Sequence, residues 1–129
     1  MRVLLDTHVL LWALGKTARL PPRSRELLQD PETEVLFSAA SIWEVAIKAA
    51  LGRMDFAVRP EAITAAALGI GFVELPVRSA AAALVADMPL HHRDPFDRLL
   101  VAQAITEPAR LLTADPQLPP YSDLVTLLA

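Results

Sequence analysis

The chain has 129 residues, which is long enough for one domain with a substantial hydrophobic core, and we expect a single domain over residues 1–129. Its 12 basic and 15 acidic residues give a net charge of −3, which excludes a general electrostatic attraction to nucleic acid or to an anionic membrane. The absence of cysteine excludes thiol nucleophiles, disulfides, thiolate zinc sites and iron–sulfur clusters, and it favours a reducing compartment.

The first fifteen residues, MRVLLDTHVLLWALG, have roughly the length of a signal peptide. Asp6 and His8 interrupt this stretch and leave only residues 9–14 as an unbroken apolar run. No other apolar run approaches the length of a membrane span. We therefore expect a cytoplasmic protein that does not associate with a membrane.

Short apolar runs alternate along the chain with segments of helical periodicity. In chain order, the pattern predicts a strand at Arg2–Leu5, helices at Thr7–Leu14 and Pro22–Leu28, a strand at Glu34–Phe37, helices at Ser41–Leu51 and Pro60–Leu68, a strand at Gly71–Leu75, helices at Ser79–Asp87 and Pro95–Thr106, and strands at Arg110–Thr113 and Leu124–Leu127. Gly52 is placed to end the helix before it. Strands that alternate with helices predict an α/β fold, with a mainly parallel sheet of about five strands and helices on both faces.

Four acidic residues fall at positions that such a sheet brings together. Asp6 ends the first strand and Asp115 follows the fourth, while Glu44 and Asp97 are expected in the first turns of two helices. In a parallel α/β sheet, the carboxyl ends of the strands and the first turns of the helices after them share one edge. We therefore expect all four carboxylates at that edge.

Each of these acids also has a purely structural interpretation. Glu44 completes an S-x-x-E capping box with Ser41, Asp97 would complement the dipole of its helix, and Asp115 is a common turn residue. Asp6 is the hardest to explain in this way, because the apolar residues on both sides of it predict a largely buried charge.

Taken together, the four carboxylates would lie at one edge without obvious basic partners at the strand ends. At about 4 Å, each like-charge pair costs on the order of 4 kcal/mol at an effective dielectric near 20. A divalent cation removes this cost, and several carboxylates without cysteine or ordered histidine spacing suit Mg²⁺ or Mn²⁺ better than zinc. Because such an ion activates water and stabilises charge on a phosphoryl oxygen, the pattern favours cleavage of phosphodiester bonds.

The segments that carry these acids resemble the motifs of the PIN-domain ribonucleases, especially the VapC-type toxins of prokaryotic toxin–antitoxin pairs. LLDTHVLLWAL is similar to the first motif with Asp6, SAASIWEVAIK to the second with Glu44, HRDPFDRLLVAQA to the third with Asp97, and LLTAD to the fourth with Asp115. The resemblance implies a single PIN-like domain and a Mg²⁺- or Mn²⁺-dependent endoribonuclease, with these four acids as its catalytic and metal-binding residues. It also implies an RNA substrate, a cognate antitoxin and usually a homodimer. The third motif has a second acid, Asp94, which fits a helix cap better than a ligand.

Polar residues near the motifs admit two interpretations each. The hydroxyls of Thr7 and Thr113 either orient a carboxylate or cap strand ends. Arg93 and Arg98, beside the third motif, either contact RNA phosphates or are solvated surface charges. His91 and His92 either help a proton transfer or are loop residues without that role.

Other functions compete with this interpretation. A haloacid-dehalogenase-type phosphatase also has an aspartate at the end of its first strand, but it needs a second one two residues later, where this chain has His8. The four glycines form neither a P-loop nor a dinucleotide-binding turn. Three alternatives remain open: a nuclease that acts on DNA, a nuclease with a housekeeping role in RNA processing, and a nonenzymatic partner-binding module whose acids only cap helices.

Overall fold

The computed structural model describes residues 1–53 and 58–128, so residues 54–57 and 129 of the expected domain lie outside the described residues. Five parallel strands of the described chain form one sheet in the order β3-β2-β1-β4-β5. Their bounds are β1 (Arg2–Leu5), β2 (Glu34–Ser38), β3 (Val73–Leu75), β4 (Arg110–Thr113) and β5 (Val125–Leu127). The expected parallel α/β sheet is confirmed.

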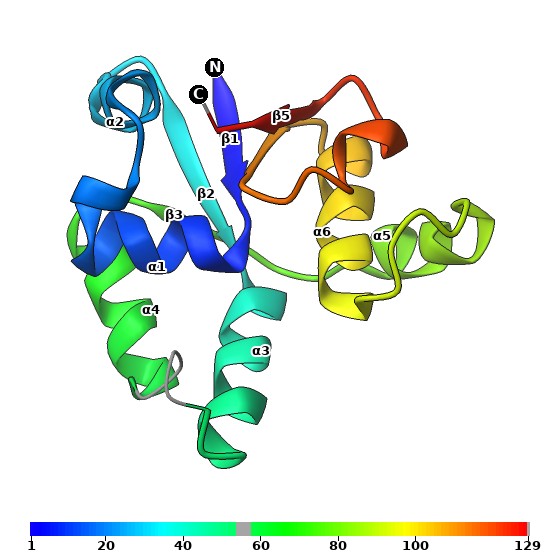
Figure 1. Ribbon diagram of the computed structural model, residues 1–129, viewed down its shortest axis with the longest axis horizontal. Coiled ribbons are helices and arrows are strands. Elements are labelled where there is room, and N and C mark those ends of the chain that lie inside the picture. Colours follow the sequence, from blue (N-terminus) through cyan, green and yellow to red (C-terminus); the bar gives the residue numbers. More distant parts are fainter. Residues whose placement is uncertain (54–57, 129) are drawn as a thin grey trace.

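The connections between the strands are helical. Within the described residues the α-helices are α1 (Thr7–Gly15), α2 (Pro22–Gln29), α3 (Ala39–Ala50), α4 (Pro60–Gly69), α5 (Ser79–Leu84) and α6 (Pro95–Thr106). Short 3-10 turns lie at η1 (Thr17–Arg19), η3 (Val85–Asp87) and η4 (Pro119–Tyr121). Figure 1 shows α1, α2 and α4 on one side of the sheet and α5 and α6 on the other, while α3 extends beyond the carboxyl edge of β2. None of the described helices is long and apolar enough to cross a membrane.

The sheet separates two hydrophobic cores, because successive residues of a strand point to opposite faces. Val3 and Leu5 of β1 pack into the core that contains Leu10 of α1. Leu4, between them, packs into the core that contains Leu100 of α6. The helices therefore cover both faces, as the apolar character of the strands predicts.

The start of α3 differs from the prediction. The helix begins at Ala39 rather than Ser41, because the Ser38 hydroxyl caps it and accepts the backbone N–H of Ala40 at 2.9 Å. Ser38 is held in this role by the buried side chain of Gln103 in α6, to which its hydroxyl donates at 2.5 Å. The expected Ser41–Glu44 capping box is therefore wrong, and Glu44 lies in the second turn of the helix instead of the first.

Two other boundaries shift for local reasons. The strand expected from Gly71 begins at Val73, because Gly71 has a φ of 92° and belongs to the turn after α4. The helix expected over Ser79–Asp87 divides into α5 and η3. Gly52 has a φ of 74° and follows the last turn of α3, so its expected capping position is confirmed.

The strand order reverses at β1. From β1 the chain crosses to β2 on one side of β1, whereas β4 pairs with β1 on the other side. Open α/β sheets bind their ligands outside the carboxyl ends of the strands, at the point where the strand order reverses. Asp6 follows β1 and Asp115 follows β4, so both lie at this point.

Candidate functional site

Asp6 is a buried carboxylate with two structural partners. One oxygen, Oδ1, accepts the backbone N–H of Val9 at 2.9 Å and so caps α1. The other, Oδ2, accepts a short hydrogen bond from the hydroxyl of Thr113, and that hydroxyl also accepts the backbone N–H of Asp115 at 3.0 Å. Burial raises the pKa of Asp6, and these hydrogen bonds only partly oppose the effect. Thr113 thus orients the acids at the ends of β1 and β4.

Glu44 projects from α3 and is 3% exposed. The hydroxyl of Thr7 donates to its Oε1 at 2.6 Å, and the ammonium of Lys48, one turn later in α3, lies 2.5 Å from its Oε2. Thr7 therefore orients a carboxylate, like Thr113. Lys48 corrects the expectation that the acids lack basic partners, and the i,i+4 spacing of Glu44 and Lys48 is a signal that the sequence contains.

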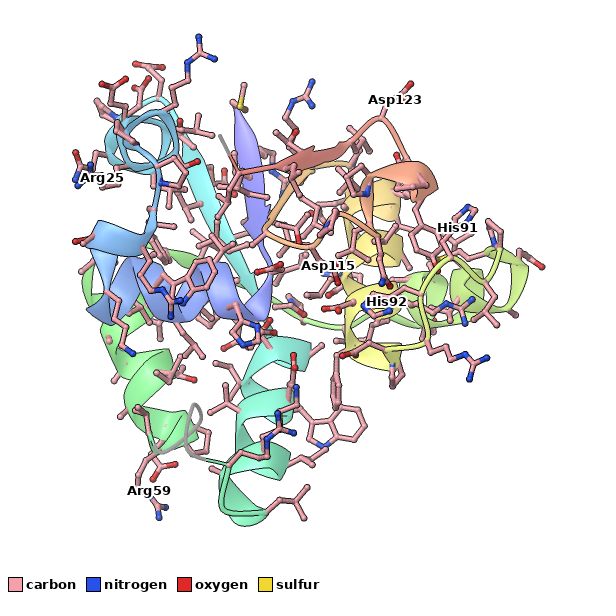
Figure 2. All side chains as sticks on the ribbon, viewed as in Figure 1. Arg25, Arg59, His91, His92, Asp115 and Asp123 are labelled. Atoms are coloured by element: carbon pink, nitrogen blue, oxygen red, sulfur yellow. The ribbon has the colours of Figure 1, made fainter. Side chains whose placement is uncertain are left out.

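Asp97 and Asp115 meet around a second basic partner, His92. The imidazole Nε2 of His92 lies 3.1 Å from Asp97 Oδ2 and 2.9 Å from Asp115 Oδ2. One ligand-type atom from each of the three residues falls within 4.8 Å of the others. Figure 2 shows Asp115 and His92 next to each other beyond the strand ends, with His91 farther toward the outside of the molecule. The side chains of Asp97 and Asp115 are 19% and 30% exposed, so this part of the site is open to solvent.

The electrostatics of Asp97 connect this group to the other acids. Burial and the negative charges of Asp94, Asp6 and Glu44 raise the pKa of Asp97 to about 7. Asp6 and Glu44 do not belong to the 4.8 Å group found among the described residues, yet they are close enough to act on Asp97. Asp94 caps α6, since its Oδ1 accepts the N–H of Phe96 at 2.9 Å and that of Asp97 at 3.3 Å.

The basic residues beside the third motif have different roles. Arg98 is a structural residue, because its Nη2 donates to the carbonyl oxygens of Val85 and Met88 at 3.2 and 3.1 Å and so holds the segment between α5 and α6. His92, for which proton transfer and a plain loop position were both open, bridges two carboxylates. No spacing in the sequence indicates that contact, because it depends on how the loop between η3 and α6 is folded.

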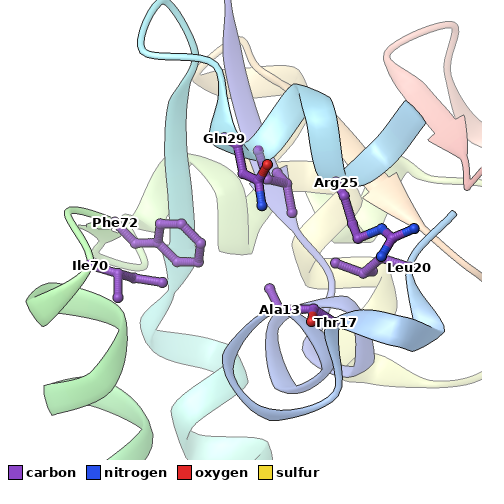
Figure 3. Close-up of a pocket in the computed structure, with 8 residues that line it drawn as sticks. Ala13, Thr17, Leu20, Arg25, Gln29, Ile70 and Phe72 are labelled. Atoms are coloured by element: carbon purple, nitrogen blue, oxygen red, sulfur yellow. The ribbon is translucent and has the colours of Figure 1, made fainter. Parts of the chain in front are cut away.

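The chemistry of the site fits a hard divalent cation. The carboxylates of Asp6, Glu44 and Asp115 lie around Asp97, whose pKa is raised. A cation among these carboxylates would favour their ionised form. One cavity elsewhere in the described chain lacks this chemistry. A pocket of about 340 Å³ between α1, α2 and the start of β3 has no carboxylate in its lining, which includes Thr17, Arg25 and Phe72 (Figure 3).

Replacing Thr113 with valine is expected to weaken both the fold and the site. The variant leaves the buried Asp6 Oδ2 without its hydroxyl donor and the N–H of Asp115 without its acceptor, at a cost of about 1–3 kcal/mol in the free energy of unfolding. We also expect about a 10- to 100-fold weaker affinity for Mn²⁺. Urea unfolding and calorimetric titration measure the two effects. Thr113→Ser keeps the hydroxyl and is the matched control; equal behaviour of the two variants would contradict the role of the hydroxyl.

The stability of the protein in a chelating buffer is expected to fall as the pH rises. Asp97 has an ordinary pKa of 3.8 and a folded-state pKa of about 7, so the folded state binds the proton more tightly than the unfolded state between these values. The free energy of unfolding should therefore decrease from pH 4 to pH 7 by on the order of 3 kcal/mol from this group. The raised pKa of Asp6 acts in the same direction.

Urea unfolding at pH 4 to 8 in EDTA measures this dependence, with Asp97→Asn as the control that removes the Asp97 contribution. Mg²⁺ should restore stability at pH 8, because it binds the ionised carboxylates of the folded state. An identical pH dependence in the parent and in Asp97→Asn would refute the assignment to Asp97.

Comparison with known proteins finds one matching family and several solved structures with a similar fold. The family model described as the PIN domain matches residues 3–123. No curated protein sequence matches the chain.

Among solved structures, one similar chain comes from VapBC2 of Rickettsia felis, bound to a DNA fragment from the VapBC2 promoter. It has 14% identity, a TM-score of 0.70 and full coverage of both chains. A toxin–antitoxin complex from Klebsiella pneumoniae has a chain of 17% identity and TM-score 0.63, with 96% of this chain and 95% of that chain covered. VapBC-1 from nontypeable Haemophilus influenzae gives 17% identity and TM-score 0.63, with 98% and 96% covered. At such identities the likeness concerns the fold.

Proposed function

This chain belongs to the PIN domain family, and from that premise we propose that it is a Mg²⁺- or Mn²⁺-dependent endoribonuclease, the toxin of a toxin–antitoxin pair. The observation that carries the proposal is the gathering of Asp6, Glu44 and Asp115 around Asp97, at the strand-order reversal between β1 and β4. Helix capping alone accounts for only part of this arrangement, because Glu44 caps nothing and Asp97 is repelled by its neighbours.

Asp6, Glu44, Asp97 and Asp115 are the residues proposed to hold the cation and to act in catalysis. A divalent cation bound there would activate a water molecule and stabilise negative charge on the phosphoryl oxygen. The chain itself supplies rigidity on the buried side, where Thr113 holds Asp6 and Thr7 with Lys48 holds Glu44. Asp97 and Asp115 are partly exposed and leave the site open to a polynucleotide.

A cleavage assay with matched substrates tests the nuclease proposal. Labelled single-stranded RNA, structured RNA and single-stranded DNA of the same sequence are incubated with the protein in EDTA, in Mg²⁺ and in Mn²⁺. We expect internal cleavage of RNA only with a divalent ion. Cleavage in EDTA, or no cleavage of any substrate, would overturn the metal-dependent mechanism. Equal cleavage of DNA and RNA would instead overturn the RNA specificity and leave a general nuclease.

The toxin assignment draws on the similar structures, which are toxin–antitoxin complexes. This chain also has apolar surface available for a protein partner. A pocket of about 740 Å³ between α1 and α4 is lined by Leu11, Trp12 and Ile63, among others. Trp43 of α3 is 60% exposed and contacts the ring of Phe96 at 5.2 Å between ring centroids. We propose a cognate antitoxin as the partner and a homodimer as the assembled state.

Expression in a bacterial host tests the toxin proposal independently of the cleavage assay. We expect growth arrest by the parent protein, relief of the arrest by the product of a small neighbouring gene, and normal growth with Asp6→Asn. Harmless expression of a protein that cleaves RNA in the test tube would favour a housekeeping role in RNA processing. Analytical ultracentrifugation tests the homodimer, for which we expect twice the mass of one chain.

A further inference from the structure

His92 lies between two of the proposed metal ligands, which come from different elements of the fold. Asp97 belongs to the first turn of α6, and Asp115 follows β4. The Nε2 atom of His92 is within hydrogen-bond distance of one oxygen of each, at 3.1 and 2.9 Å. These distances suit either a third metal ligand or a hydrogen-bond donor to the carboxylates. Which of the two roles His92 has depends on whether its Nε2 carries a proton.

The main chain determines which nitrogen carries the proton. The backbone N–H of Arg93 donates to His92 Nδ1 at 3.0 Å, and the N–H of Asp94 points at the same atom from 3.5 Å. Nδ1 must therefore present a lone pair, which leaves the proton of the neutral ring on Nε2. Metal ligation by Nε2 would require this proton to move to Nδ1, where it would meet two N–H donors. The local backbone thus disfavours His92 as a ligand and favours it as a donor to the carboxylates.

The backbone that presents this imidazole is itself anchored. The hydroxyl oxygen of Tyr121, in η4, accepts the N–H groups of both His91 and His92, at 2.9 and 2.8 Å. The ring of His91 packs edge-on against Tyr121, with 4.8 Å between ring centroids. The loop is therefore fixed from the C-terminal part of the chain, and the position of His92 does not depend on its contacts with the carboxylates alone.

We propose that His92 is a positioning residue, whose Nε2–H joins Asp97 to Asp115 and holds the two carboxylates at the separation that the cation site needs. The inference rests on the proposed function of these acids as ligands. One oxygen of each carboxylate is engaged by the shared proton, and the remaining lone pairs stay available to a cation. Loss of an outer hydrogen-bond donor of this kind lowers metal affinity by about 10- to 100-fold.

Two amide variants separate the donor role from a ligand role. The amide nitrogen of glutamine reaches about as far as Nε2 of histidine, whereas that of asparagine reaches only about as far as Nδ1. His92→Gln should therefore keep a donor for the two carboxylates, while His92→Asn should not. The matched control is His91→Asn, which removes an exposed ring but keeps the backbone N–H groups of residues 91 and 92 that the Tyr121 hydroxyl accepts. Circular dichroism spectra of all three variants check that each is folded.

Calorimetric titration of the full chain with Mn²⁺ provides the decisive readout. We expect the dissociation constant to rise at least about 10-fold in His92→Asn, and to stay within about 3-fold of the parent in His92→Gln and His91→Asn. Equal affinity in the parent and His92→Asn would overturn the positioning role, and so would an equal loss in His92→Gln and His92→Asn. If the parent binds no divalent ion, the proposed function fails together with this inference, which is a distinguishable result.

Nuclear magnetic resonance of the ¹⁵N-labelled imidazole tests the proton position directly. We expect the Nε2 of His92 to carry the proton both in EDTA and in saturating Mg²⁺. Loss of that proton on addition of Mg²⁺ would identify His92 as a ligand and overturn the proposal.

Discussion

Replacement of Asp6 by asparagine is expected to abolish metal-dependent RNA cleavage while the chain stays folded. Asp6 is the acid that follows β1 at the strand-order reversal, and its carboxylate acts together with Glu44 on Asp97. Without its negative charge, the proposed cation site would lose a hard oxygen ligand and part of its attraction for a divalent ion. We expect the cleavage rate to fall at least about 100-fold. Removing a residue that only hydrogen-bonds a metal ligand typically costs about 10- to 100-fold, and loss of a ligand should cost more.

The persistence of the fold in Asp6→Asn follows from the contacts of the side chain. Asparagine is as good a helix cap as aspartate, so its Oδ1 can still accept the N–H of Val9. Its amide can donate to the hydroxyl of Thr113, which otherwise donates to the carboxylate. Burial disfavours the charge of Asp6, so its removal should offset any stability lost from weaker hydrogen bonds. We therefore expect the midpoint of urea unfolding to change little. Cleavage by this variant at the parent rate would contradict the mechanism.

Asp97→Asn and Asp94→Asn are expected to separate chemistry from helix capping. The two acids are three residues apart, yet Asp94 accepts two backbone N–H groups at the start of α6 whereas Asp97 contacts His92 across the site. We expect Asp97→Asn to lose cleavage as completely as Asp6→Asn. Asp94→Asn should keep cleavage within about 10-fold and cost less than about 1 kcal/mol in the free energy of unfolding, because asparagine retains the cap but loses its charge.

Initial cleavage rates in Mg²⁺ and urea unfolding curves measure these two variants side by side. Asp94 also raises the pKa of Asp97, so Asp94→Asn should make Asp97 ionise at a lower pH. Equal losses of cleavage in the two variants would mean that Asp94 belongs to the site.

The elements that the sequence predicted most closely are those with strong local signals. The bounds of α6 agree with the prediction, because Asp94 and Pro95 form a helix start that needs no distant partner. β1 and β4 also agree, since each is a short apolar run beside a charged or polar residue. The parallel arrangement follows from the alternation of strands and helices.

The start of α3 could not be predicted locally, because the chain offers two serines three residues apart. Both Ser38 and Ser41 are good helix caps. The choice of Ser38 depends on Gln103, which lies 65 residues later and accepts the Ser38 hydroxyl. A contact between the end of β2 and α6 thus decides a boundary that propensity leaves open.

The candidate site also combines features that the sequence predicts with one that it does not. The positions of Asp6, Asp97 and Asp115 were predictable, because strand ends and first turns of helices meet at one edge in any parallel sheet. Glu44 was expected in a first turn as well, but it lies in the second turn of α3. The i,i+4 pair of Glu44 and Lys48 was available from the spacing. The contact of His92 with Asp97 and Asp115 was not predictable, since it requires a loop anchored by Tyr121, 29 residues after His92.

Anomalous diffraction from crystals of the protein soaked in Mn²⁺ tests directly whether these acids form a divalent cation site. We expect an anomalous difference peak at the carboxyl ends of β1 and β4, with carboxylate oxygens of Asp6, Glu44, Asp97 or Asp115 as ligands, either directly or through water. His92 should lie outside the inner coordination shell. Crystals of Asp6→Asn soaked in the same way should show a weaker peak or none. Well-ordered parent crystals with no peak at this edge, or with a peak only elsewhere on the molecule, would refute a cation site formed by these acids.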